Sequence, residues 1–137
     1  MSKLVGKWKF ESSEGWEEYM KGLDVGFALR KIGGMTKPQE EISIDGDFWQ
    51  LDILSTFKNI HLKFKLGVAF EEHTVDGRTV QSTFTVEDDK LVHVQRGKPA
   101  DSIITRELEN DGTLKVTFKV VGKEEATCIR KYKRIES

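Results

Sequence analysis

Short segments in which apolar and polar residues alternate recur along most of this 137-residue chain. The alternation is clear in GKWKF, EISID, HLKFK, TFTV and LKVTFKV, and it extends from Val5 to Ser13 and from Pro38 onward. A period of two is typical of strands with one buried face, because successive side chains point to opposite faces of a sheet. Asx and Gly residues, which accept the positive φ of tight hairpin turns, separate the segments at Asp45-Gly46, Asp76-Gly77, Asp88-Asp89 and Asn110-Asp111-Gly112. The pattern predicts a meander of roughly ten antiparallel strands.

The period changes between Gly15 and Gly34. Apolar residues there recur at helical spacing, first from Trp16 to Leu23 and then from Val25 to Ile32. Ser13 is expected to cap the first helix, and Gly33 with Gly34 to end the second. The chain is therefore predicted to insert a helix-turn-helix between its first and second strands.

A meander of this length is stable as a sandwich or as a barrel, because open sheet edges aggregate. One short helix pair cannot cover the whole face of a sheet. The pattern therefore favours an all-β fold for residues 1–137: an antiparallel up-and-down β-barrel of roughly ten strands, a hollow single domain with the helix pair as its lid.

Composition excludes several classes of function. The 22 Lys and Arg against 23 Asp and Glu give a net charge of −1, so no bulk field attracts nucleic acid or membranes. A single cysteine, Cys128, excludes an internal disulfide, and MSKLVGKWKF lacks the apolar run of a signal peptide, so an intracellular, soluble protein is expected. The three histidines have no metal-ligand spacing, and no nucleophile elbow, P-loop or dinucleotide fingerprint is present. We therefore predict that the protein is not an enzyme and that it binds neither a metal nor a cofactor.

The stretch TCIRKYKRI near the C-terminus carries charge on both faces of a predicted strand. Arg130 and Tyr132 share one face, and Lys131 and Lys133 share the other. An inward-facing Arg130 would need an anionic, largely apolar ligand, because an unpaired buried cation is strongly unfavourable. Alternation alone does not choose between that arrangement, an internal charge network and ordinary surface residues.

Several motifs together carry a resemblance to a known family. They are the LSTFKNI segment with Phe57, the LVHVQ segment, and an N-terminal pattern made by Gly6, Trp8, Phe10, Gly15, Trp16, Glu17, Tyr19 and Met20. From Gly6 to Arg134 the chain resembles the intracellular lipid-binding proteins, and within them the fatty-acid-binding proteins. The resemblance implies a β-clam barrel that carries a long-chain fatty acid or related lipid carboxylate without covalent chemistry.

The same resemblance implies the site. Arg106, Arg130 and Tyr132 are expected to hold the lipid carboxylate. The cavity and its portal are expected to include Trp16, Tyr19, Met20, Val25, Leu29, Phe57, Val75, Asp76, Arg78, Gln95, Phe118 and Cys128. Trp16 stands where the family usually has Phe or Tyr, which predicts a narrower cavity or a tilted first helix.

Lys21, Arg30 and Lys31 lie on the polar sides of the two predicted helices. The simpler interpretation is a solvated face. In some family members basic residues at matching positions contribute to nuclear import or to contact with anionic membranes, and that interpretation stays open. The family also leaves two alternatives to a fatty-acid carrier: a retinoic-acid carrier, and a shuttle that delivers a signalling lipid to a nuclear receptor. A cytoplasmic monomer that also enters the nucleus is the corresponding expectation.

Overall fold

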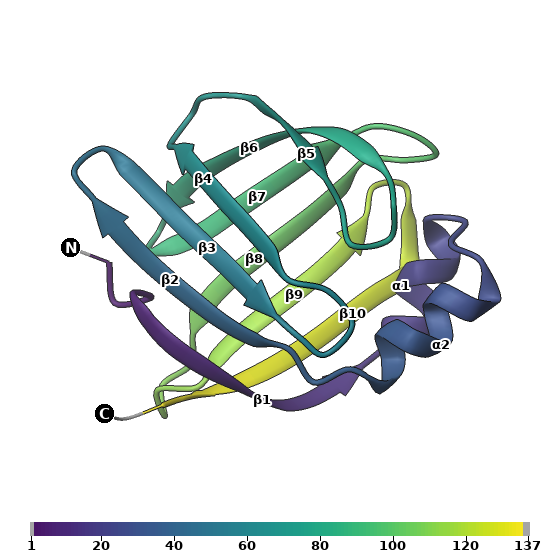
Figure 1. Cartoon of the computed structure of the whole chain (residues 1–137), viewed down its shortest axis with the longest axis horizontal. Coiled ribbons are helices and arrows are strands. Elements are labelled where there is room, and N and C mark those ends of the chain that lie inside the picture. Colours follow the sequence, from purple (N-terminus) through teal and green to yellow (C-terminus); the bar gives the residue numbers. More distant parts are fainter. Residues whose placement is uncertain (1, 136–137) are drawn as a thin grey trace.

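The computed structural model describes residues 2–135 and confirms the predicted barrel of ten antiparallel strands with two helices after the first strand (Figure 1). The elements are β1 (Gly6–Glu14), α1 (Trp16–Gly22), α2 (Phe27–Met35), β2 (Gln39–Asp45), β3 (Phe48–Leu54), β4 (Ile60–Lys65), β5 (Phe70–His73), β6 (Thr79–Glu87), β7 (Lys90–Arg96), β8 (Ser102–Leu108), β9 (Leu114–Val120) and β10 (Lys123–Arg134). No helix within the described part of the chain is long and apolar enough to cross a membrane.

The strands form one sheet in the order β4-β3-β2-β1-β10-β9-β8-β7-β6-β5. Sequence neighbours pair with each other, and the pairing of β1 with β10 joins the two ends of the meander. β4 and β5 are the edges of the sheet and are not paired with each other. Aromatic side chains pack across this gap, where the ring of Phe64 of β4 stacks with those of Phe70 and Phe84 at centroid distances of 6.0 and 3.8 Å. The barrel is therefore closed partly by hydrogen bonds and partly by side-chain packing.

The hairpin turns follow the predicted chemistry. Asp88 and Asp89 both have positive φ, at 51° and 63°, which is the conformation of a two-residue type I′ turn between β6 and β7. The strands flanking each turn alternate between a buried and an exposed face. The buried faces carry the core, with Trp8, Leu51 and Phe84 almost fully enclosed. The remaining inward positions line an internal cavity.

α1 and α2, here called the lid, lie together at one end of the barrel (Figure 1). The predicted helix ends were wrong. α1 follows Gly15, whose φ of 83° and close approach to the Thr127 carbonyl leave no room for a Cβ, while Ser13 remains within β1. α2 continues through Gly33 to Met35, because the glycine lets the Trp16 indole pack against the helix backbone instead of ending it.

Candidate ligand-binding cavity

A cavity extends from the lid into the barrel. It contains about 1010 Å³ of space free of protein atoms, part of which is open to solvent. Its rim includes Leu29 of α2, Phe57 between β3 and β4, and Val75 between β5 and β6, all of them exposed apolar side chains.

Most of the residues predicted for the cavity or its portal line this space. They are Trp16, Tyr19, Met20, Leu29, Phe57, Val75, Asp76, Arg78, Gln95, Arg106, Phe118, Arg130 and Tyr132. Val25 and Cys128 do not, which corrects their expected position. Both are buried in the hydrophobic core, and the Cys128 Sγ lies 3.8 Å from Ser13 Oγ of β1.

The face of β10 that bears Arg130 and Tyr132 points inward. These two residues are 3% and 1% exposed, whereas Lys131 and Lys133 on the other face pair with surface carboxylates. Burial raises the pKa of Tyr132 further above its usual range, as does the nearby Glu40 carboxylate, so its phenol remains a neutral hydrogen-bonding group.

Arg130 is surrounded by neutral partners. Its guanidinium lies 3.8 Å from the ring centroid of Trp16, donates from Nε to Ser13 Oγ at 3.1 Å and donates from Nη2 to the Gly33 carbonyl at 3.2 Å. No carboxylate of residues 2–135 lies within 4.0 Å of it. Arg130 is thus a buried cation, linked to both β1 and the lid, whose charge is not compensated by a nearby side chain.

Arg106 differs from Arg130, because it is paired inside the protein. Its Nε and Nη2 donate to the two oxygens of Glu40 at 2.9 and 3.1 Å, and the two residues are only 1% and 2% exposed. Burial disfavours the charged guanidinium, but the Glu40 carboxylate outweighs burial and raises the pKa of Arg106. Sequence reasoning missed Glu40, although QEEISID carries a signal: Glu40 shares the apolar face of β2 with Ile42 and Ile44.

Residues 5–135 match the model of a family described as the "Lipocalin / cytosolic fatty-acid binding protein family". The chain belongs to this family. Fatty acid-binding protein homolog 5 of Caenorhabditis elegans is 48% identical over 111 residues, 79% of this chain and 82% of that protein. Sodium/calcium exchanger regulatory protein 1 of Doryteuthis pealeii is 39% identical over 133 residues, 97% of each chain. The solved structure of the Schistosoma mansoni fatty acid binding protein in complex with arachidonic acid superposes with a TM-score of 0.92 at 37% identity, covering 99% of this chain and 98% of that one.

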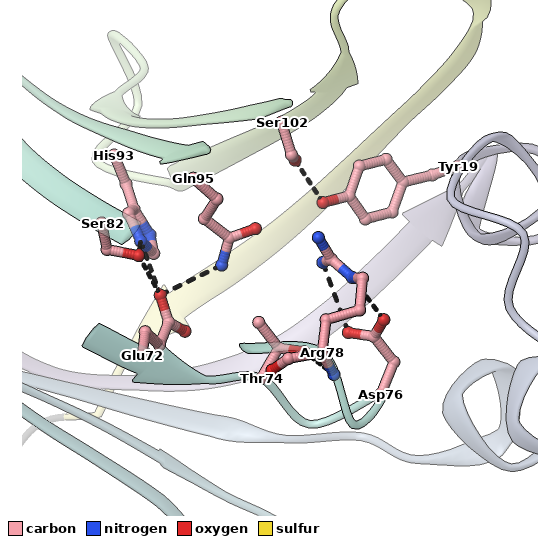
Figure 2. Close-up of polar contacts among 9 residues, drawn as sticks. All are labelled: Tyr19, Glu72, Thr74, Asp76, Arg78, Ser82, His93, Gln95 and Ser102. Carbon is pink, nitrogen blue, oxygen red and sulfur yellow. Dashed lines mark hydrogen bonds and ion pairs between the residues drawn. The ribbon is translucent and has the colours of Figure 1, made fainter. Parts of the chain in front are cut away.

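This fatty-acid-binding family member has a second buried polar cluster, centred on Glu72 of β5 (Figure 2). Glu72 Oε1 accepts hydrogen bonds from Ser82 Oγ at 2.6 Å and from Gln95 Nε2 at 3.1 Å, and it lies 2.9 Å from His93 Nε2. Burial alone would raise the pKa of Glu72, but the hydrogen bond from His93 and those from its other partners lower it to about 2. Burial lowers the pKa of His93, and the hydrogen bond with Glu72 acts in the opposite direction.

Sequence reasoning found no metal-ligand spacing for His93 or the other histidines and did not single out Glu72. Their positions were nevertheless visible in the alternation, because His93 lies between Leu91 and Gln95 on the inward face of β7, and Glu72 shares the inward face of β5 with Phe70. The pattern showed the direction of each side chain but not its partner.

Two further polar pairs lie near the lid (Figure 2). Arg78 donates from Nε to Asp76 Oδ2 at 2.7 Å, and its guanidinium points toward the phenol of Tyr19. The Tyr19 hydroxyl is hydrogen-bonded to Ser102 on β8, which ties α1 to the barrel wall. Burial raises the pKa of Tyr19 to about 12, so this phenol also stays neutral. The pairs place hydrogen-bonding groups beside the portal without an uncompensated charge.

The three basic residues predicted on the lid are not equivalent. Arg30 is mostly buried and donates to Glu17 Oε1 and to the Val25 carbonyl, both at 2.7 Å. Lys21 and Lys31 are exposed, and within residues 2–135 only Lys21 lies near a carboxylate, with Nζ 3.9 Å from Glu17 Oε1. Phe27 on the same lid is 69% exposed. The exposed part of the predicted patch therefore consists of two lysines.

Proposed function

We propose that this protein is a non-enzymatic carrier that binds a long-chain fatty acid in the barrel cavity. The observation that carries the proposal is Arg130, a buried cation beside the cavity with no carboxylate partner among residues 2–135. A fatty carboxylate would supply that partner through a charge-assisted hydrogen bond, with the neutral phenol of Tyr132 as a second contact. The relatives named as fatty-acid-binding proteins support the same ligand class.

The apolar walls would supply most of the affinity. Leu51, Ile60, Leu62, Ile104 and Phe118 line the cavity together with the lid residues. Each methylene that leaves water for such walls contributes about 0.8 kcal/mol. The tail would therefore dominate binding, and the head would set its orientation.

Delivery is proposed to take place at the lid. Phe27 and the apolar rim residues are exposed there, and Lys21 and Lys31 provide positive charge beside them. Such a surface suits a brief contact with an anionic membrane, where basic residues near the surface contribute about 1 kcal/mol each. Transfer between membranes in the cytoplasm is the corresponding role.

The proposal is tested in two steps. The protein is first purified and extracted with organic solvent, and the extract is analysed by mass spectrometry, where a fatty acid is expected. Delipidated protein is then titrated with palmitic acid by calorimetry, where saturable binding is expected. A protein that yields no lipid and does not bind palmitic acid would contradict the proposal.

A further inference from the structure

The Glu40–Arg106 pair crosses the interior of the barrel. Glu40 is on β2 and Arg106 is on β8, and three strands separate β2 from β8 in the sheet. The contact is therefore made across the cavity that both residues line. The two carboxylate oxygens of Glu40 accept hydrogen bonds from Nε–H and Nη2–H of Arg106, which is the bidentate geometry common between carboxylates and arginine. A carboxylate from the chain thus already occupies the head-group position that Arg106 would offer to a fatty acid.

This pairing changes which head group can approach Arg106. The positive charge of Arg106 is compensated, and a second carboxylate beside it would meet the negative charge of Glu40 in a buried setting. Like charges in such a setting repel strongly, because the interior screens them less than water does. An uncharged hydrogen-bonding group meets no such repulsion at the same place.

Arg106 also keeps an unused nitrogen, Nη1, which carries two N–H donors. This nitrogen is buried in the cavity wall and has no acceptor among residues 2–135. A buried donor without a partner is unfavourable, so an oxygen brought by a ligand would be stabilised there. Because the guanidinium is already neutralised by Glu40, a carbonyl or hydroxyl oxygen satisfies such a donor without adding charge. The neutral phenol of Tyr132 lines the same cavity.

We propose that Glu40 sets the head-group selectivity of this cavity: by pairing with Arg106 it admits long-chain lipids with an uncharged hydrogen-bonding head, such as primary amides and alcohols, alongside fatty acids. The inference rests on the proposed lipid-carrier function. In this arrangement a fatty acid binds at Arg130 and Tyr132 and not at Arg106, and an uncharged head binds beside Arg106. The native protein should therefore bind palmitic acid and palmitamide with dissociation constants that agree within about tenfold.

The experiment compares the ratio of the two dissociation constants, palmitamide over palmitic acid, in the native protein, two variants and one control variant. Glu40→Gln removes the competing carboxylate and frees the charge of Arg106, so the ratio should rise by roughly tenfold or more in favour of the acid. The double variant Glu40→Gln/Arg106→Gln removes both charges, so its ratio should return to within about threefold of the native value. Both probes are measured by displacement of the same fluorescent fatty acid.

Glu41→Gln is the matched control, because Glu41 is the next residue of β2, lies on the opposite face and loses the same charge. Its ratio should equal the native one. A ratio unchanged by Glu40→Gln, or a native preference for the acid above roughly a hundredfold, would overturn the inference while leaving the fatty-acid carrier intact.

Glu40→Gln leaves Arg106 unpaired, and if that variant does not fold, the double variant decides the test. A roughly tenfold loss of acid preference in the double variant would show that Arg106 binds the acid in the native protein, and this would refute the inference. If the native protein binds neither palmitic acid nor palmitamide, both the inference and the proposed function fail.

Discussion

Replacing Arg130 by Gln tests the head-group anchor of the proposed carrier. Gln keeps a hydrogen-bonding group on a shorter side chain and removes the buried charge. Hydrogen bonds to charged groups contribute about 1.5–3 kcal/mol, and each 1.4 kcal/mol corresponds to about tenfold in affinity. Arg130→Gln should therefore weaken palmitic acid binding by roughly ten- to a hundredfold.

The structure supplies a complication that the assay must separate from the loss of charge. Arg130 also packs on Trp16 and donates to the Gly33 carbonyl, so its replacement loosens the contact between β10 and the lid. A loosened lid would weaken the retention of every ligand equally. Loss of the charge should weaken only the acid, so palmityl alcohol, with the same chain and no charge, distinguishes the two effects.

The measurement is calorimetric titration of palmitic acid and palmityl alcohol into the native protein, Arg130→Gln and Lys131→Gln. Lys131 is the adjacent residue, faces outward and contacts Glu109, so its variant should change neither affinity. Alcohol binding should be preserved in Arg130→Gln. Equal losses for acid and alcohol would refute the electrostatic role of Arg130 and leave it only as a contact to the lid.

Three further predictions concern the lid and the buried clusters. Gly15→Ala should lower the thermal midpoint, because a Cβ there would lie 2.1 Å from the Thr127 carbonyl oxygen at a φ of 83°; an unchanged midpoint would contradict the packing at this turn. Glu72 has its pKa lowered to about 2 from 4.5, so its ionised form stabilises the fold above pH 4.5 by up to about 3 kcal/mol, and this stability is lost as the pH falls toward 2. The free energy of unfolding, measured with urea between those pH values, should depend less steeply on pH in Glu72→Gln than in the native protein. Joint replacement of Lys21 and Lys31 by Gln should slow fatty-acid transfer to anionic vesicles and flatten its salt dependence, whereas equal rates would favour a merely solvated face.

The strands, the hairpins and the helical insert could be predicted because each depends on a short-range pattern. Period-two alternation and Asx-Gly turns are set within a few residues, and the change to helical spacing after Gly15 is equally local. The helix ends were missed because contacts from elsewhere decide them. Ser13 stays in β1, where its hydroxyl accepts from Arg130, and Gly33 stays in α2, where Trp16 packs against it.

The polar pairs in the cavity could not be predicted for a related reason. Glu40 and Arg106 are 66 residues apart, and Glu72 and His93 are 21 apart. Alternation indicates that each of them faces inward, but which residue it meets depends on the register and closure of the barrel. An acid on an otherwise apolar strand face is the signal available in the sequence, and it marks the residue without naming its partner.

The charges of the cavity wall bear on how such a carrier exists without its ligand. Apart from Lys58 at the exposed rim, the lining contains three carboxylates and three arginines: Glu40, Glu72, Asp76, Arg78, Arg106 and Arg130. Two pairs are in direct contact, so most of the cost of burying charge is offset before any lipid enters.

A site with two bare arginines would gain more from a carboxylate, but it would leave two buried cations unpaired in the empty protein. The Glu40–Arg106 pair lowers the free-energy cost of the buried cations in the empty protein, and the same pair weakens the binding of an acidic head group. In the proposed carrier, a stable empty form and a releasable acid therefore follow from one contact.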